Sequence, residues 1–408
     1  MYLEGTVKDV DTIRYATKEG MEARGVEVFV EQEITSIDPQ AHTVEVKDHK
    51  TGKVRTESYD KLILSPGSNP FIPPIEGVDM DGIYGFGGRD NAELLRYKTV
   101  TPDIKNVVVV GGGHIGMEAA IAFAKAGKDV CLIDAVDHPL QVYLDEQLGE
   151  MVRVHLEENG VRFESDQRVK SFEGKNGHVT KVHTEKGAYP ADMVIISTGV
   201  RPNTKWLEGI VDLDERGFIE TDDYMRTSEK DIFAVGNATK ILYNPTGEYL
   251  NVALATNARK QGRFAVKNLE GPVCKFEGVQ GTSGLRIFDL KMAATGLSAQ
   301  TAQNSKVPYD SVFVELDQLV DFAPESMRKT VYAKLYYNPE TRALLGAQII
   351  SEADLTEMMN TVSMAIMNGM TIDQLAYADF FFQPTFTRPW GILNELGLAA
   401  QRKERAKQ

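Results

Sequence analysis

The chain has very little cysteine. Its 408 residues include only Cys131 and Cys274, which lie far apart and in unlike contexts. Two such residues exclude a disulfide framework and a cysteine-based metal site. The seven histidines are scattered, without a His-x-x-x-His pair, so we expect no zinc site either. Scarce cysteine suits a reducing compartment, and the sequence therefore predicts a cytoplasmic protein.

The sequence also lacks long apolar runs and an excess of positive charge. No stretch of 18 or more uncharged apolar residues occurs, so no membrane-spanning helix is expected. Residues 1–5 have neither the basic nor the apolar region of a signal peptide. A formal net charge of -14 repels nucleic acid and anionic membrane surfaces. We expect neither of them as a partner.

What the chain does contain is enough sequence for two or three domains. Short stretches of alternating apolar and polar residues predict an antiparallel meander, with strands near residues 26–30, 43–47 and 54–59. The apolar run at residues 61–67 predicts a strand that is buried on both faces. The Pro- and Gly-rich residues 69–88 are expected to form a crossover linker.

The middle of the chain changes to a strand, helix, strand pattern. Apolar stretches at residues 107–110 and 130–133 flank a helical pattern at residues 114–126. Further apolar strands are expected at residues 192–196 and 231–235. This alternation predicts a parallel α/β sheet.

The composition changes again from about Val279. Strands are expected at residues 285–290, 331–337 and 344–350, and an amphipathic helix at residues 355–367. Strands followed by helices predict a separate α+β domain.

The motif with the clearest chemistry is a glycine-rich loop, GGGHIG, at residues 111–116. It satisfies G-x-G-x-x-G, follows an apolar strand and opens a helix. Gly111 would permit the tight turn, Gly113 would let a pyrophosphate approach the backbone, and Gly116 would let helix and strand pack closely. The helix N-terminus would offer its free N–H groups to the phosphates.

Asp134 ends the next strand, about 20 residues after the loop. Its carboxylate would accept hydrogen bonds from the adenosine ribose hydroxyls and would repel a 2′-phosphate. The following Ala135-Val136-Asp137 offers no arginine to receive such a phosphate. These features favour NADH over NADPH. Domains of this kind also bind FAD, and a glycine-rich turn in a nucleotide-free fold is the alternative, so the loop alone does not name the ligand.

Longer motifs are dispersed over most of the chain, from Tyr2 to near Gln401. They are YLEG (2–5), YDKLILSPG (59–67), GVRPNT (199–204), YMRTSE (224–229), ATNARKQGR (255–263) and ADFFFQP (378–384). In their order and content they resemble the pyridine nucleotide–disulfide oxidoreductases. Within that family the chain looks most like the NADH peroxidases, with the water-forming NADH oxidases close behind.

The resemblance implies an α/β fold class with two nucleotide-binding Rossmann-like domains, the FAD one incomplete, and a C-terminal α+β interface domain. Residues 1–105 would be the remainder of the FAD-binding domain with its meander and linker, and residues 106–221 the NADH-binding domain. Residues 222–278 would return to the FAD-binding domain, and residues 279–408 would form the dimerisation domain. A homodimer or homotetramer is expected.

The resemblance also assigns site residues by position. The NADH pocket would be lined by Ile115, Asp134, Tyr143 and Gly199, with Gly284 from the C-terminal domain closing it. FAD would lie along Ser65, Pro66, Gly67 and Ser68, with Asn237 in the second FAD motif and Ala253, Leu254 and Ala255 beside the flavin. Arg259 would support catalysis near the peroxide. The plainer alternatives are surface packing for Tyr143 and a solvated helix position for Arg259.

Three positions depart from the family's pattern. Asn237 stands where the family has an aspartate that holds a ribitol hydroxyl of FAD, so the charge-assisted bond is lost. Gly87 stands where the peroxidases have an arginine that contacts FAD, with Arg89 nearby. His114 replaces a tyrosine near the flavin, and it would serve as a lid or as a cap of the helix start.

The resemblance further implies parts that this chain does not contain. The family begins with a strand, a glycine-rich loop for FAD and a redox cysteine in a Ser-Phe-Leu-Ser-Cys-Gly context, together with a histidine near the peroxide. We therefore expect a truncated chain that is inactive as given and whose retention of FAD is doubtful. Because the family's first strand is central, the strands at residues 61–65 and 231–235 would flank a gap. Cys131 in a buried strand and Cys274 at a domain junction are poor substitutes for the redox thiol.

The implied function is an FAD-dependent NADH peroxidase. Electrons would pass from NADH to the flavin and then to a cysteine sulfenic acid, reducing hydrogen peroxide to water. A water-forming NADH oxidase that uses oxygen, or a coenzyme A disulfide reductase, is the alternative within enzymes. A non-catalytic, dimerising NADH-binding module is the alternative of another class, and an NADH sensor is a third.

Overall fold

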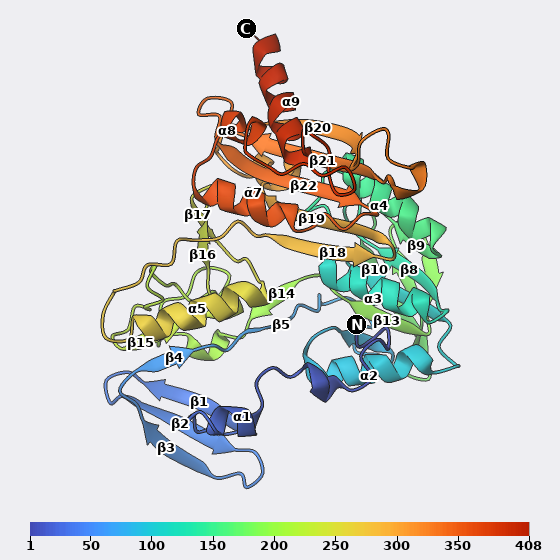
Figure 1. Ribbon diagram of the computed structural model, residues 1–408. Helices are drawn as coiled ribbons and strands as arrows, with labels where there is room; N and C mark the ends of the chain where they lie inside the picture. Colours follow the sequence, from blue (N-terminus) through green and yellow to red (C-terminus); the bar gives the residue numbers. More distant parts are fainter. Residues whose placement is uncertain (408) are drawn as a thin grey trace. The chain divides into compact units, whose positions relative to one another are not determined.

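The computed structural model describes residues 1–407 of the chain, which divide into two compact units. The first unit consists of Met1–Phe71, Gly199–Leu242 and Tyr249–Gly278. The second consists of Ile72–Thr198, Tyr243–Glu248 and residues 279–407. Figure 1 shows the elements of both units along the chain.

The regular elements cover most of the described residues. The α-helices are α1 (Lys18–Glu22), α2 (Gly88–Val100), α3 (His114–Lys125), α4 (Glu146–Glu158), α5 (Ala255–Lys267), α6 (Ala299–Gln303), α7 (Met358–Met367), α8 (Ile372–Ala376) and α9 (Ile392–Ala406). Short 3₁₀ helices lie at Val10–Ile13, Lys205–Leu207, Gly236–Ala238 and Glu325–Met327.

The strands of the first half are β1 (Gln32–Asp38), β2 (Thr43–Asp48), β3 (Val54–Ser58), β4 (Leu62–Leu64), β5 (Ser68–Pro70), β6 (Ile83–Gly85), β7 (Asn106–Val110), β8 (Asp129–Ile133), β9 (Val161–Glu164), β10 (Val169–Lys175), β11 (His178–Thr184), β12 (Ala188–Pro190), β13 (Met193–Ile196) and β14 (Val200–Pro202). Those of the second half are β15 (Ile232–Ala234), β16 (Ile241–Tyr243), β17 (Glu248–Leu250), β18 (Ser283–Ile287), β19 (Leu290–Gly296), β20 (Asp310–Asp317), β21 (Thr330–Tyr337) and β22 (Leu344–Ser351).

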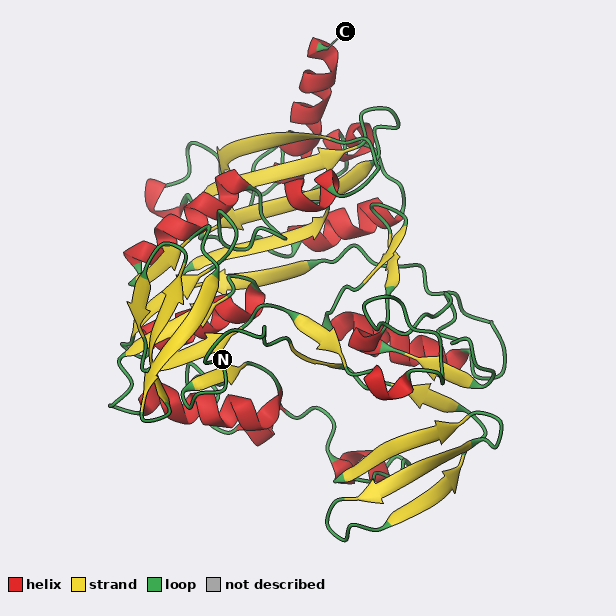
Figure 2. Cartoon of the chain, turned by 180° about the vertical axis from the view of Figure 1, so that it is seen from behind, coloured by secondary structure: helices red, strands yellow, loops and turns green. Residues whose placement is uncertain are grey.

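The first unit contains the predicted meander. The strands β1, β2 and β3 form an antiparallel sheet in that order, which is visible as three adjoining yellow arrows in Figure 2. The strand expected at residues 26–30 is wrong, because this segment pairs with no strand among residues 1–407 and the sheet begins at Gln32. Phe29 is 56% exposed and lies beneath the guanidinium of Arg55, 5.4 Å away. Alternation of apolar and polar residues could not supply a neighbouring strand.

The expected gap between residues 61–65 and 231–235 is also wrong. The strands β4 and β15 pair with each other directly and in parallel, Leu62 opposite Ile232 and Leu64 opposite Ala234. Lys61 and Asp231 join the two strands at their start through an ion pair of 2.6 Å. The carboxyl ends of both strands therefore lie side by side, where the segments that follow them meet. Strands β5 and β14 form a second, antiparallel pair beyond these ends.

The second unit contains the predicted parallel sheet, with strand order β6-β13-β7-β8-β9. Every residue of β13 is buried, as are the last four of β7 and of β8. This is the burial expected for strands covered on both faces. The expected linker at residues 69–88 is more ordered than predicted, because it contributes β5 and β6. Helix α2, which begins at Gly88, was not predicted.

The C-terminal part of the second unit is an antiparallel sheet with strand order β18-β19-β22-β21-β20. Helices α7, α8 and α9 share one apolar core with it. The strand expected at residues 285–290 is wrong in detail, because two strands meet there at a turn in which Phe288 has a φ of 55°. The expected helix at residues 355–367 begins at Met358.

No helix within residues 1–407 has the length and apolar character needed to cross a membrane.

Candidate functional site

The glycine-rich loop joins β7 to α3 in the second unit. Gly111 has a φ of 106°, and a Cβ atom on it would lie 2.5 Å from the carbonyl oxygen of Ser197. A Cβ atom on Gly116 would lie 1.9 Å from the carbonyl oxygen of Gly111. Both distances are below any ordinary contact, so the turn and the close packing of α3 on β7 require glycine at these two positions.

Gly113 differs from its neighbours because nothing lies within 4 Å of the place where its Cβ would be. It is the N-cap residue of α3, and no side chain caps that helix start. The first-turn N–H groups of α3 therefore remain available, and they carry the positive end of a 12-residue helix. An anion such as a pyrophosphate fits this position, because the backbone is open there and no side chain competes for its donors.

Asp134 follows β8 and lies against the loop. Its Oδ2 accepts a hydrogen bond of 2.5 Å from the backbone N–H of Gly112, and its Oδ1 accepts one of 2.6 Å from Ala135. The carboxylate thus holds the loop and stands beside the start of α3. From this position its oxygens can also accept hydrogen bonds from ribose hydroxyls.

The segment after β8 also contacts the loop, through Leu140, which the sequence did not reveal, and through Tyr143, which the family resemblance had assigned to the NADH pocket. Leu140 is buried with a φ of 59°, and its N–H donates to the carbonyl of Gly112 over 3.0 Å. Three residues on, the ring of Tyr143 stacks on that of His114, with centroids 3.9 Å apart and planes 10° apart. A leucine in the left-handed region carries no sequence signal, so the contact made by Leu140 could not be expected.

His114 is the first residue of α3 and does not cap it. Its Nε2 is buried and has no hydrogen-bond partner. Burial lowers the pKa of His114 to about 4, so the ring is neutral near pH 7. The start of α3 is therefore flanked by two uncharged stacked rings. Ile115, next in the helix, is 41% exposed.

Of the two remaining residues predicted for the NADH pocket, one belongs to the same unit. Gly284 lies on β18, which contacts α3, and a Cβ there would approach the carbonyl of Met292 to 3.2 Å. Gly199 belongs to the first unit, where it has a φ of 111° and accepts a hydrogen bond from the N–H of Phe71. Its role in the pocket stays a prediction.

The residues predicted for FAD lie in the first unit, at the carboxyl ends of β4 and β15. The Nδ2 of Asn237 lies 3.4 Å from Oγ of Ser68, which brings the segment Ser65, Pro66, Gly67 and Ser68 beside the second predicted FAD motif. The N–H of Gly236 donates to Oε1 of the buried Gln261 over 2.9 Å. Asn237 therefore occupies a fixed place and still offers an amide oxygen as an acceptor.

The start of α5 completes this region. Ala253 and Ala255 are exposed, and Leu254 is the N-cap residue without a side-chain cap. Small exposed side chains leave room for a planar ring, and the free N–H groups of α5 favour the electron-rich side of a flavin. These residues fit FAD, as does the acceptor on Asn237.

Arg259 lies one turn into α5 and is exposed. Its guanidinium lies 4.8 Å from the ring centroid of Tyr15, which is 80% exposed. Its predicted place near a peroxide stays a prediction. Arg89, which follows Gly87 closely in the sequence, forms an ion pair of 3.1 Å with Glu93 of the same helix.

The two cysteines are both free thiols, one buried and one partly buried. Cys131 is buried in β8, and burial raises the pKa of its thiol to about 12. A thiol of this kind is protonated and unreactive near neutral pH. The backbone N–H and carbonyl of Cys274 are both bonded to the side chain of Asn268, over 2.8 Å each.

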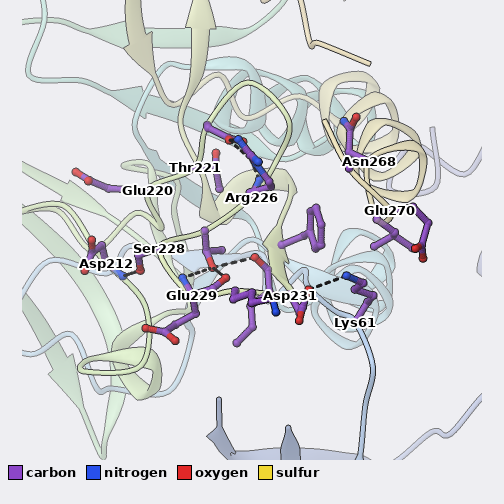
Figure 3. A pocket seen from close by; sticks show the side chains of 17 residues that line it. Lys61, Asp212, Glu220, Thr221, Arg226, Ser228, Glu229, Asp231, Asn268 and Glu270 are labelled. Carbon is purple, nitrogen blue, oxygen red and sulfur yellow. Dashed lines mark hydrogen bonds and ion pairs between the residues drawn. The ribbon is translucent and has the colours of Figure 1, made fainter. Parts of the chain in front are cut away.

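A pocket of about 700 Å³ opens in the first unit and is shown in Figure 3. Its charged lining residues largely satisfy each other, as in the pairs Lys61–Asp231 and Arg226–Asp222, both at 2.6 Å. None of the residues predicted for NADH or FAD lines it. The pocket is therefore separate from the predicted nucleotide contacts.

The parallel sheet with its glycine-rich loop, and the second nucleotide-type region at β4 and β15, define a flavin-dependent oxidoreductase that uses a nicotinamide nucleotide. Comparison with known proteins agrees. A model of the pyridine nucleotide-disulphide oxidoreductase family matches residues 3–262, and a model of that family's dimerisation domain matches residues 282–391. The chain belongs to the pyridine nucleotide-disulphide oxidoreductase family. Its cofactors are NADH and FAD.

Named relatives are similar over nearly the whole chain. An NADH oxidase of Enterococcus faecalis is 38% identical over 401 residues, covering 98% of this chain and 89% of the relative. An NADH oxidase of Streptococcus pyogenes is 36% identical over 400 residues, covering 95% of this chain and 86% of the relative. The structure of a water-forming NADH oxidase from Lactobacillus brevis bound to NADH has a TM-score of 0.95 at 36% identity, covering 100% of this chain and 89% of that one.

Proposed function

We propose that the chain binds NADH at the start of α3 and is a subunit of a flavin-dependent NADH peroxidase. This enzyme reduces hydrogen peroxide to water. The observation that carries the NADH part is the loop around Gly113, open to a phosphate and flanked by Asp134. Motifs such as ATNARKQGR (255–263) and ADFFFQP (378–384) are specific for the family, and peroxide is proposed as the oxidant because the chain as a whole looks most like the peroxidases.

The chain's own residues bind and orient the nucleotide. The N–H groups of α3 hold the pyrophosphate, and Asp134 accepts hydrogen bonds from the adenosine ribose. The stacked rings of His114 and Tyr143 flank the helix start with neutral groups, which offer no positive charge to a 2′-phosphate. When bound, NADH supplies a hydride and FAD accepts it; Ser68, Asn237 and Ala253, Leu254 and Ala255 would hold the flavin.

Peroxide reduction of this kind needs a reactive thiol, which cycles through a sulfenic acid. Cys131 is buried in β8, and burial raises the pKa of its thiol, which makes it a poor nucleophile for this role. Cys274 lies beyond α5, with its backbone held by Asn268. We therefore propose that this chain binds NADH but reduces peroxide only together with a cysteine that neither of these two supplies.

A water-forming NADH oxidase is the second candidate. It is favoured by the named relatives, because those of Enterococcus and Streptococcus are NADH oxidases and the Lactobacillus structure is a water-forming one. The electron donor and the two cofactors are the same in both candidates. They differ in the oxidant, which is oxygen in one and hydrogen peroxide in the other.

The test measures NADH oxidation by the purified chain after addition of FAD, with peroxide under argon and separately with oxygen. The same assay is run on the chain extended at its N-terminus by a cysteine-bearing segment of the family, and on that form with the cysteine replaced by serine. We expect peroxide-dependent oxidation only with the intact cysteine.

Oxygen consumption without release of peroxide by the extended form would replace the first candidate by the second. If the extended form reduces coenzyme A disulfide in preference to oxygen and peroxide, the chain belongs instead to a coenzyme A disulfide reductase. NADH binding without oxidation in any form would leave a non-catalytic, dimerising module, and the enzymatic proposal would then be wrong.

A further inference from the structure

Asp145 is a charged residue in the interior of the second unit, only 3% exposed, at the start of α4. It occupies the N-cap position, where an aspartate normally accepts hydrogen bonds from the first N–H groups of its own helix. Here its side chain makes no such bond. The carboxylate is directed instead at residues from the C-terminal part of the chain.

Four donors surround this carboxylate. Its oxygens accept hydrogen bonds from Tyr336 Oη over 2.5 Å, from Gln348 Nε2 over 2.8 Å and from the N–H of Ala299 over 2.8 Å, and Lys334 forms an ion pair with it. The N–H of Asp145 in turn donates to Gln348 Oε1 over 2.9 Å. These partners belong to β21, to β22 and to the start of α6.

The balance of these contacts keeps Asp145 ionised. Burial alone would raise its pKa, but the hydrogen bonds from Gln348, Lys334 and Tyr336 outweigh burial and lower it. Removing one partner of a buried charge strongly destabilises the folded protein, whereas a buried charge with all its hydrogen bonds fixes a single geometry. Contacts with the C-terminal sheet therefore fix the position of Asp145, which ends the segment of residues 140–145 before α4.

The other end of that segment contacts the nucleotide loop. The N–H of Leu140 donates to the carbonyl of Gly112, as described above, and Ser298 Oγ donates to the carbonyl of Val142 over 3.0 Å. Tyr143 lies between these anchors and Asp145, with its ring on His114. A short stretch of chain thus connects the C-terminal sheet to the start of α3.

We propose that Asp145, Lys334, Tyr336 and Gln348 form a positioning clamp, through which the C-terminal sheet holds Tyr143 beside the start of α3 and so sets the affinity for NADH. None of the four residues needs to touch the nucleotide. The inference rests on the proposed binding of NADH at α3 and adds to it a control by the C-terminal domain.

Two neighbouring tyrosines of β21 provide a matched test. Tyr336→Phe removes the hydroxyl that donates to Asp145, and Tyr337→Phe removes one that donates to Glu404 of α9 over 2.7 Å. Both side chains are fully buried and both variants lose one hydroxyl. The dissociation constant for NADH is measured by fluorescence titration of each variant of the full chain, well below its melting temperature, which is recorded in parallel.

We expect Tyr336→Phe to raise the dissociation constant for NADH roughly three- to thirtyfold, the range of energetic coupling through packed networks. Tyr337→Phe should leave it unchanged at a comparable loss of thermal stability. Two results would overturn the clamp while leaving NADH binding intact. Either both variants keep the dissociation constant of the unaltered chain, or the dissociation constant rises equally in both. Absence of NADH binding by the unaltered chain would instead refute the proposed function.

Lys334→Met and Lys334→Arg provide a second pair if Tyr336→Phe does not fold. The first removes the ion pair with Asp145 and keeps most of the side-chain volume, and the second restores a positive charge. The clamp predicts weaker NADH binding for Lys334→Met and recovery for Lys334→Arg. Unchanged binding in both would overturn it.

Discussion

At the scale of single residues, two glycines of the loop at residues 111–116 have different physical roles. Gly116 has backbone packed against it, so any side chain there displaces α3 or β7. Gly113 has open space around it, and a side chain there meets nothing until a ligand arrives. The same substitution at the two positions therefore separates folding from binding.

Gly116→Ala should lower the free energy of unfolding by roughly 1–3 kcal/mol, the usual cost of overpacking a close contact. Gly113→Ala should leave the free energy of unfolding nearly unchanged and weaken NADH binding about tenfold or more, because its methyl group occupies the approach of the pyrophosphate. Denaturant unfolding and NADH titration measure the two effects. Equal NADH affinity in Gly113→Ala and the unaltered chain would contradict the assignment of this loop.

His114 makes the folding stability of the second unit depend on pH in a direction that its pKa determines. Its pKa is about 4 in the folded chain and 6.5 in a model compound, because burial disfavours the charged ring. Between these two values the unfolded chain binds more protons, so folding stability is complete above pH 6.5 and falls as the pH is lowered toward 4. The slope is at most roughly 1.4 kcal/mol per pH unit from this residue.

His114→Phe should remove this part of the pH dependence while keeping a ring on Tyr143. Unfolding in denaturant at several pH values between 4 and 7 measures it, with His183→Phe as the control, since that histidine is only half-buried on β11, where it pairs with Glu173. The same slope in His114→Phe as in the unaltered chain would show that the ring is not buried as a neutral base.

At the scale of elements, the burial of α7 illustrates how the C-terminal sheet is covered. Met359 is fully buried in the core shared by α7, α8, α9 and the sheet, whereas Met364 of the same helix is 67% exposed. Met359→Ala should lower the free energy of unfolding by about 2–5 kcal/mol, and Met364→Ala by less than roughly 0.5 kcal/mol. Chemical denaturation of both variants checks this, and similar losses would contradict the packing of α7.

Elements that depend on local pattern were predictable, and those that depend on distant partners were not. The sequence predicted β7, α3 and β8 because apolar runs and a glycine-rich turn are local signals. It failed at residues 26–30, where alternation was present without a neighbouring strand. It also failed at the turn near Phe288, because a left-handed phenylalanine is not a turn signal.

The same distinction applies to the site. Gly111, Gly113 and Asp134 follow from a spacing rule, and the structure brings them together at the start of α3. The clamp around Asp145 could not be found in this way, because Gln348 is 203 residues away in the sequence. Nothing local distinguishes Asp145 from an ordinary helix cap.

At the scale of the whole molecule, exposed aromatic side chains of the dimerisation domain favour assembly of several chains. Those most exposed are Phe322, Tyr377, Phe381, Phe386 and Trp390. Large exposed apolar groups of this kind are typical of interfaces. Together with the match to the family's dimerisation domain, they predict a homo-oligomer, either a dimer or a tetramer.

Phe386→Glu should convert this oligomer to smaller species, because it places a charge in an apolar interface. Phe29→Glu, at a phenylalanine that is 56% exposed in the first unit, should not. Sedimentation velocity of the three proteins measures their masses. A monomeric unaltered chain, or dissociation by Phe29→Glu alone, would show that the oligomer is not built on the C-terminal domain.

The central claim is that the start of α3 binds NADH and that Asp134 selects it over NADPH. Equilibrium titration of the purified chain with each nucleotide, in the absence of FAD, tests it most directly. We predict saturable binding of one NADH per chain, with NADPH weaker by about tenfold or more because its 2′-phosphate meets the carboxylate of Asp134. Asp134→Ala should reduce the difference between the dissociation constants for NADH and NADPH. No binding, or equal affinity for the two nucleotides, would contradict the account.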